Sequence, residues 1–222
     1  MLKTIYYLLI LSGISILVLG WKMLDRKMFL LLGLLIVAFF TERIDDIFSP
    51  PYIPGMDRPT KGVFIYIHHI YRVIELSLLS MYYYFLFDLK RNKQIVLAGT
   101  LLFFIYFFYD FACHSENFNS KKRVDLLVEG LFLTVYSVLF LIELYQREKP
   151  VIVKRYAHFW IVIANLIFFS ASSFFNGYID YLLTNRMLVY IKLSLIMVVL
   201  NYMLYSFYII GFLCHLQAKK LA

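Results

Sequence analysis

The sequence predicts an all-α membrane protein in which residues 1–222 form one domain of seven transmembrane helices. Apolar residues make up 62% of the chain and charged residues 16%, whereas soluble domains contain about 45–50% apolar and about 25% charged residues. Apolar stretches close to the length that crosses a bilayer, about 17–25 residues, alternate with short charged segments. Helices are expected because backbone polar groups in lipid must be satisfied within the spanning segment.

The predicted helices follow one another with short connections. They cover residues 4–21, 28–41, 63–87, 95–111, 126–145, 157–176 and 187–213, and an extension of the second, with a polar end, to Phe48 is an alternative. The first is expected to stay in the protein rather than be cleaved as a signal peptide, because it lacks a small-x-small cleavage pattern and Lys22, Arg26 and Lys27 follow it. Residues 49–55 read Ser-Pro-Pro-Tyr-Ile-Pro-Gly and cannot be helical, so they form either a lid over the bundle or an ordinary connector.

Basic residues are distributed unequally between the two ends of the predicted bundle. One end carries twelve Lys and Arg residues and the other carries eight. Because cytoplasmic loops are enriched in Lys and Arg, we expect the N-terminus outside and the C-terminus inside. The net charge of +8 is therefore attributed to membrane orientation, and no nucleic acid is expected as a partner.

A short pattern occurs twice, in the third and the fifth predicted helices. Residues 75–82 and 129–136 both fit Glu-x3-Leu-[Ser/Thr]-[Met/Val]-Tyr. This suggests three helical hairpins repeated in parallel, formed by helices two and three, four and five, and six and seven. Chance similarity is the alternative, because leucine and tyrosine are abundant in this chain.

Ionisable residues gather in the outer halves of several predicted helices. His68, Arg72 and Glu75 are spaced i, i+4 and i+7, which places them on one face of a helix. Asp125 and Glu129 open the fifth helix at i and i+4. We expect these faces to line one outward-opening polar pocket. Its candidate ligand-binding residues are His68, Arg72, Glu75, Asp110, Glu129 and Lys192.

Three interpretations of these charges remain open. Arg72–Glu75 and Lys192–Glu129 could be ion pairs that fix helix packing. Alternatively, the pocket binds a ligand or a proton, with Arg72 or Lys192 facing an anionic group and the glutamates as counter-charges. A third interpretation is a zinc site, although its spacing matches no known metal signature. Its candidate ligands are His68, Asp110, His114 and Glu129.

Three segments resemble small seven-span integral membrane proteins of bacteria. They are His-Ile-Tyr-Arg-Val-Ile-Glu at 69–75, Glu129 at the start of helix five, and His-Phe-Trp-Ile-Val-Ile-Ala-Asn-Leu-Ile-Phe-Phe-Ser at 158–170. Many such proteins are uncharacterised, and others resemble the membrane sensor modules of signalling proteins. The resemblance implies a multi-pass protein of the bacterial inner membrane. No output domain is attached here, so a signalling role would require a partner protein.

The leading hypothesis is a receptor-like or regulatory membrane protein without catalytic residues. It would bind a small or lipidic ligand in the pocket and act on a partner protein within the lipid bilayer. One alternative is a membrane-embedded hydrolase acting on lipid, with a metal as an option, and another is a small transporter or proton pathway using Glu75 and Glu143. No retinal is expected, because Lys192 lies near the outer end of helix seven, far from the mid-membrane position of a Schiff base.

Overall fold

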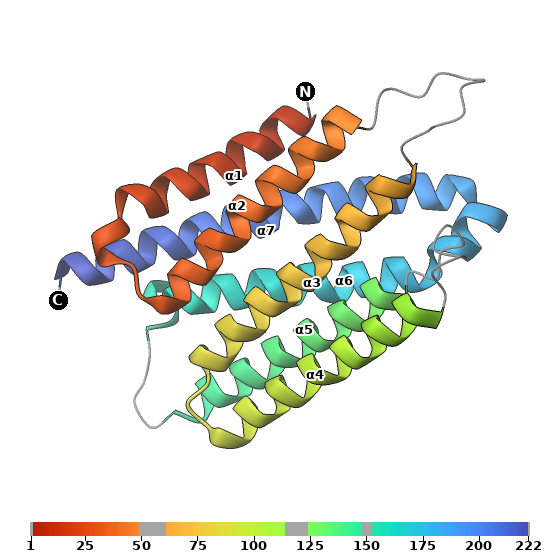
Figure 1. The fold of residues 1–222 in the computed structure, drawn as a ribbon. Helices are drawn as coiled ribbons and strands as arrows, with labels where there is room; N and C mark the ends of the chain where they lie inside the picture. Colours follow the sequence, from red (N-terminus) through yellow and green to blue (C-terminus); the bar gives the residue numbers. More distant parts are fainter. Residues whose placement is uncertain (1, 49–60, 114–123, 148–151, 222) are drawn as a thin grey trace.

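The computed structural model describes residues 2–48, 61–113, 124–147 and 152–221 (Figure 1). The described residues form seven α-helices and two short 3-10 helices, without strands, which confirms the predicted all-α class. The α-helices are α1 (Leu2–Leu19), α2 (Arg26–Phe48), α3 (Lys61–Leu86), α4 (Lys90–Cys113), α5 (Val124–Tyr145), α6 (Ala157–Asn185) and α7 (Met187–Leu221), and the 3-10 helices are η1 (Trp21–Met23) and η3 (Val153–Arg155). The predicted lid at residues 49–55 lies outside the described residues.

Two helices extend well beyond their predicted ends, and buried side chains account for both differences. Helix α6 continues past residue 176 because Ile179 and Leu182 keep its apolar face buried. Helix α7 continues past residue 213, and buried His215 on this extension places Nε2 3.1 Å from the Met23 carbonyl oxygen. The predicted loop between α6 and α7 is therefore reduced to Arg186.

Four of the described helices are long and apolar enough to cross a membrane, which indicates an integral membrane protein. The four segments are Lys90–Tyr109, Asp125–Tyr145, Ala157–Ile179 and Met187–Lys220. A further apolar stretch, Thr4–Leu19, is shorter. Helix α3 carries His68, Arg72 and Glu75 among its apolar residues and is not among these four segments.

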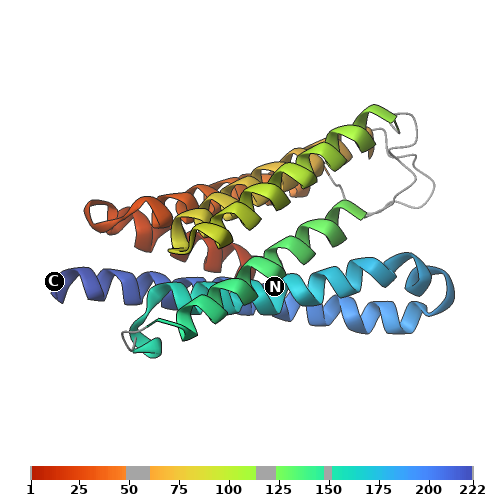
Figure 2. The same cartoon turned by 90° about the horizontal axis from the view of Figure 1, so that it is seen from below.

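Successive helices run in opposite directions, so the two chain ends lie at opposite ends of the bundle (Figure 1). Helix α7 packs against α1 and α6, α6 packs against α5, and α3 contacts α2, α4 and α5. In Figure 2, α6 and α7 lie side by side, apart from α3 and α4. This arrangement brings the middle of α3 and the first turns of α5 together.

A glycine permits the close approach of α5 and α6 next to one of the predicted site residues. A Cβ at Gly130 would lie 3.0 Å from the Phe169 carbonyl oxygen and would also collide with Ser173. Small residues at helix contacts let backbones approach closely in membrane proteins. The contact places Glu129, the preceding residue, in the interior of the bundle, where it is 2% exposed.

Candidate functional site

The candidate site is built around an ion pair between α3 and α5. The guanidinium of Arg72 donates from Nη1 to Oδ2 of Asp125. The Nδ1 atom of His69 lies 3.1 Å from the same oxygen. His69 and Arg72 are three residues apart and share a face of α3, while Asp125 lies in the first turn of α5. Both members of the ion pair are mostly buried, with side chains 16% and 7% exposed.

Two glutamates lie next to this ion pair. Glu129 is one helical turn along α5 from Asp125, and it interacts electrostatically with Glu75, Arg72 and Asp125. Glu75 interacts in turn with Tyr71, Arg72 and Glu42. Glu129 is buried, whereas Glu75 is partly exposed. We name the group His69, Arg72, Glu75, Asp125 and Glu129 the α3–α5 cluster.

The α3–α5 cluster contains more carboxyl groups than cationic groups. Glu75, Asp125 and Glu129 face one permanent cation, Arg72, which already binds Asp125. Ionised carboxylates are costly to bury unless they are paired and hydrogen-bonded. The two glutamates therefore require protons or an additional cation.

Two buried carboxyl oxygens of the cluster have no hydrogen-bond partner among the described residues. They are Oδ1 of Asp125 and Oε1 of Glu129, from residues spaced i and i+4 on α5. Buried polar atoms are nearly always hydrogen-bonded, and an ionised carboxylate accepts hydrogen bonds without donating any. Within the described part of the chain both oxygens thus lack a donor, which a bound ligand would supply.

Tyrosines connect the cluster to α1, α2 and α7. The Tyr6 hydroxyl donates to Oε1 of Glu42 at 3.3 Å and lies 3.2 Å from the Tyr205 hydroxyl. The Tyr7 hydroxyl donates to the Glu42 carbonyl oxygen at 3.1 Å. Glu42 also interacts with Glu75. A change of charge at the cluster would therefore alter the contacts among α1, α2 and α7.

A second buried network lies deeper in the bundle and joins four helices. The Tyr208 hydroxyl donates to Oδ1 of Asn165 at 2.5 Å, and Nδ2 of Asn165 donates to the Tyr83 hydroxyl at 3.1 Å. The Tyr83 hydroxyl lies 2.6 Å from Oγ of Ser137. The network links α7, α6, α3 and α5 in that order, and its polar side chains are satisfied by one another.

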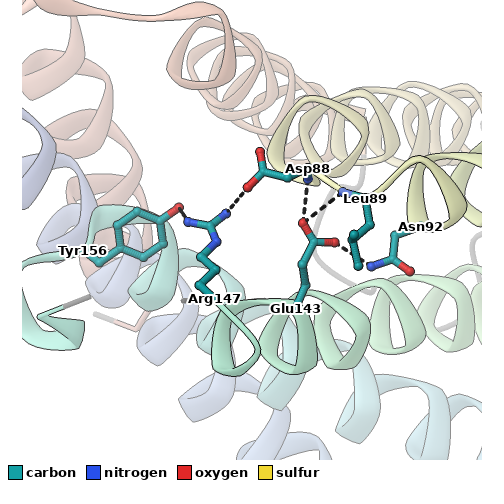
Figure 3. Close-up of polar contacts among 6 residues, drawn as sticks. All are labelled: Asp88, Leu89, Asn92, Glu143, Arg147 and Tyr156. Atoms are coloured by element: carbon teal, nitrogen blue, oxygen red, sulfur yellow. Dashed lines mark hydrogen bonds and ion pairs between the residues drawn. The ribbon is translucent and has the colours of Figure 1, made fainter. Parts of the chain in front are cut away.

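The opposite end of the bundle contains a polar cap at the turn between α3 and α4 (Figure 3). The Glu143 carboxylate on α5 accepts hydrogen bonds from Nδ2 of Asn92 and from the backbone nitrogen of Asp88, both at 2.5 Å, and from the Leu89 nitrogen at 3.3 Å. Arg147 donates to Asp88 at 2.8 Å and to the Tyr156 hydroxyl at 3.3 Å. Glu143 therefore fixes a turn.

The structure brings together three of the six predicted ligand-binding residues, namely Arg72, Glu75 and Glu129. His69, rather than His68, approaches Asp125. Lys192 is exposed on α7, and within the described part of the chain it forms no ion pair with Glu129. The side chain of Asp110 lies outside the described residues.

Sequence reasoning omitted two members of the cluster, His69 and Asp125, from the candidate ligand-binding residues. Two spacing signals could have identified them. His69 is three residues before Arg72 and Asp125 is four residues before Glu129, so each shares a helix face with a predicted site residue. A pairing of the two faces, α3 against α5, would have placed all four side chains together.

The predicted zinc site remains a prediction. Among the described side chains, no group of three or more His, Cys, Asp or Glu residues is arranged to hold a metal ion. Two of its four candidate ligands, Asp110 and His114, lie outside the side chains that the structure describes. Glu129 instead interacts with Glu75, Arg72 and Asp125.

Comparison with protein-family models, curated proteins and solved structures finds no match to this chain. The fold and the cluster define a class in physical terms. The protein is a helical membrane protein in which a buried, acid-rich cluster joins α3 to α5 and is connected through tyrosines to α1, α2 and α7.

Proposed function

We propose that this protein is a receptor-like or regulatory membrane protein that binds a small ligand at the α3–α5 cluster and acts through a partner protein. The observation that carries this proposal is a pair of buried carboxyl oxygens, on Asp125 and Glu129, for which the described residues supply no donor. Buried ionisable groups within membrane helices are costly and usually mark functional sites. The partial exposure of Glu75 gives a ligand a route to the cluster.

The charge of the cluster favours a cationic ligand, such as a protonated amine. Such a group supplies both the missing positive charge and the N–H donors that the two oxygens lack. An anionic group is less favoured, because Arg72 is bound to Asp125 and Lys192 is exposed, without an ion pair to a carboxylate of the cluster. The proposed ligand is therefore a cation, whereas the sequence analysis considered an anionic group facing Arg72 or Lys192.

A signal from the cluster would travel through the tyrosine connections. A cation next to Glu75 would change the electrostatic interaction between Glu75 and Glu42. Glu42 accepts the hydrogen bond of Tyr6, which contacts Tyr205 on α7. A partner protein in contact with α1 or α7 would then sense ligand binding as a shift of these helices.

We further propose seven membrane crossings, with the N-terminus outside and the C-terminus inside a bacterial inner membrane. The alternating helix directions in Figure 1 are consistent with this topology. The basic residues Lys90, Arg91, Lys219 and Lys220 lie at the proposed cytoplasmic end, in agreement with the usual enrichment of positive charge there. The repeated hairpins stay a prediction.

The alternative functions receive less support. A proton pathway requires acidic groups along the whole route, and Glu143, its candidate at the cytoplasmic end, is engaged by three hydrogen-bond donors. A lipid-acting hydrolase requires a nucleophile or a metal-bound water near the cluster. The side chains of the α3–α5 cluster include no nucleophilic Ser or Cys.

Chemical modification with dicyclohexylcarbodiimide tests the proposal, because this apolar reagent adds to protonated carboxyl groups. Without a ligand, we expect Glu75 and Glu129 to hold protons, so the reagent labels this pair, and mass spectrometry of the digested protein detects the labels. Methylammonium should slow the labelling by displacing a proton, whereas sodium chloride at equal ionic strength should not. Glu129→Gln should lower the total labelling.

Glu143 is the internal control in the same digest, because it is buried like Glu129 but accepts hydrogen bonds from three donors. It should remain unlabelled throughout. If methylammonium and sodium chloride affect the labelling of Glu75 and Glu129 equally, the cluster does not bind organic cations and the proposal is wrong.

A further inference from the structure

A groove of about 480 Å³ lies between α6 and α7. Its walls are apolar and include Ile167, Ala171 and Phe174 on α6 and Leu193, Met197 and Leu200 on α7. The single hydroxyl in the lining, that of Ser170, donates to the Ile167 carbonyl oxygen at 3.2 Å and is satisfied within its own helix. The volume falls within the range of ligand sites, about 300–1,000 Å³.

The groove lies at the depth of one lipid leaflet. Leu193, Met197 and Leu200 are spaced i, i+4 and i+7 and form one face of α7. At 1.5 Å per residue, the segment from Leu193 to Leu200 lies roughly 10–20 Å from Arg186, where α6 turns into α7. One leaflet contributes about half of the hydrocarbon thickness of about 30 Å. An acyl chain therefore reaches this depth when its headgroup lies near Arg186.

Two cations lie between the groove and this end of the bundle. Arg186 is exposed at the turn, where its carbonyl oxygen accepts hydrogen bonds from the nitrogens of Val189 and Tyr190. Lys192 is exposed four residues before Ile196, which lines the groove. Neither cation forms an ion pair with any carboxylate among the described side chains. As far as the described side chains extend, both are therefore available to an external anion.

An aromatic contact separates the groove from the turn. The rings of Phe175 and Tyr190 stack with centroids 6.0 Å apart, which joins α6 to α7 at the end of the groove nearest Arg186. Beyond the other end of the groove the two helices meet again, where the ring centroids of Trp160 and Phe207 lie 5.7 Å apart. The apolar groove thus lies below two cations. This arrangement fits a phospholipid, whose acyl chain lies below its phosphate.

We propose that the α6–α7 groove binds one anionic phospholipid, with an acyl chain along Leu193, Met197 and Leu200 and the phosphate between Arg186 and Lys192. This lipid site is separate from the α3–α5 cluster and does not depend on the function proposed for it. It also gives Lys192 a role, because a lysine on an exposed apolar helix face gains a phosphate partner.

Native mass spectrometry of the full chain in neutral detergent tests the lipid site. The probes are phosphatidylglycerol and phosphatidylcholine with identical acyl chains. Wild type should bind the first phosphatidylglycerol more tightly than phosphatidylcholine, and Lys192→Gln should reduce this preference about fivefold, since one cation near the headgroup is worth about 1 kcal/mol. Lys219→Gln, an exposed lysine at the other end of α7, should leave the preference unchanged.

A second pair of variants tests the groove itself. Met197→Trp fills the groove and should weaken the first binding event for both lipids, whereas Val199→Trp, on the exposed side of α7, should not. Equal binding by wild type and Met197→Trp would overturn the proposal, as would equal effects of Lys192→Gln and Lys219→Gln. A dimer that Met197→Trp abolishes would also overturn it, because a second chain would then occupy the groove. If Met197→Trp does not fold, the comparison of Lys192→Gln with Lys219→Gln still tests the proposal.

Discussion

Replacing Arg72 by methionine is expected to lower the free energy of unfolding by about 3–5 kcal/mol, the usual cost of removing one partner from a buried ion pair. Asp125 would keep its buried position, and His69 would remain as its neighbour. Methionine retains most of the length of the arginine side chain, so the loss would report mainly the missing charge. Unfolding in detergent micelles, followed by circular dichroism, measures the effect.

The double variant Arg72→Met, Asp125→Leu is the control for this result. It removes both charges of the ion pair together, and apolar replacement of a buried ion pair is often neutral or stabilising. We expect it to recover most of the lost stability. A loss below about 1 kcal/mol in Arg72→Met would contradict the buried position of the ion pair, because only exposed pairs contribute so little.

Replacing Glu143 by alanine is expected to cost about 2–4 kcal/mol of stability, because each buried donor left unsatisfied costs about 1–3 kcal/mol. Three donors depend on this carboxylate, on Asp88, Leu89 and Asn92 (Figure 3), and water at the turn would compensate some of them. The same unfolding measurement applies.

Two variants of neighbouring groups calibrate the Glu143 result. Glu143→Gln keeps one carbonyl oxygen as acceptor and should lose about half as much stability. Arg147→Ala removes the ion pair with Asp88, whose side chain is 77% exposed, and should cost below about 1 kcal/mol. Equal losses in Glu143→Ala and Arg147→Ala would show that the carboxylate does not hold the turn.

The helices could be predicted because the physical signal is strong. Long apolar stretches separated by charges leave few alternatives in a membrane. The end of α6 could not be predicted in this way, because Asn176 and Gly177 resemble a helix end. Ile179 and Leu182 extend the helix by burying their side chains, and that gain depends on neighbouring helices whose positions the sequence alone does not specify.

The candidate site could be predicted in part. The spacing of Arg72 and Glu75 placed them on one face of α3, and the structure brings Glu129 of α5 within electrostatic reach of both. The choice between His68 and His69 depends on the rotation of α3 about its axis, which adjacent histidines leave open. The side of the bundle to which Lys192 belongs was open for the same reason, because the apolar residues of α7 surround the helix and do not define an inner face.

The proposed binding site at the α3–α5 cluster differs from a structural ion pair in its excess of carboxyl groups. Arg72 and Asp125 neutralise each other and hold α3 to α5. Glu75 and Glu129 add carboxyl groups without adding a matching cation. Residues retained for binding often reduce stability, so removal of such a group should not weaken the fold.

The stability of Glu129→Gln, measured beside Asp125→Asn, tests the proposed cation site most directly. Glutamine has nearly the same shape as glutamate and removes the charge. If Glu129 is retained for ligand binding, the unfolding free energy of Glu129→Gln should lie within about 1 kcal/mol of wild type, or above it. Asp125→Asn leaves Arg72 without its counter-charge and should lose about 3 kcal/mol or more. If Glu129→Gln loses as much as Asp125→Asn, then Glu129 is a structural partner and the cluster is not a cation site.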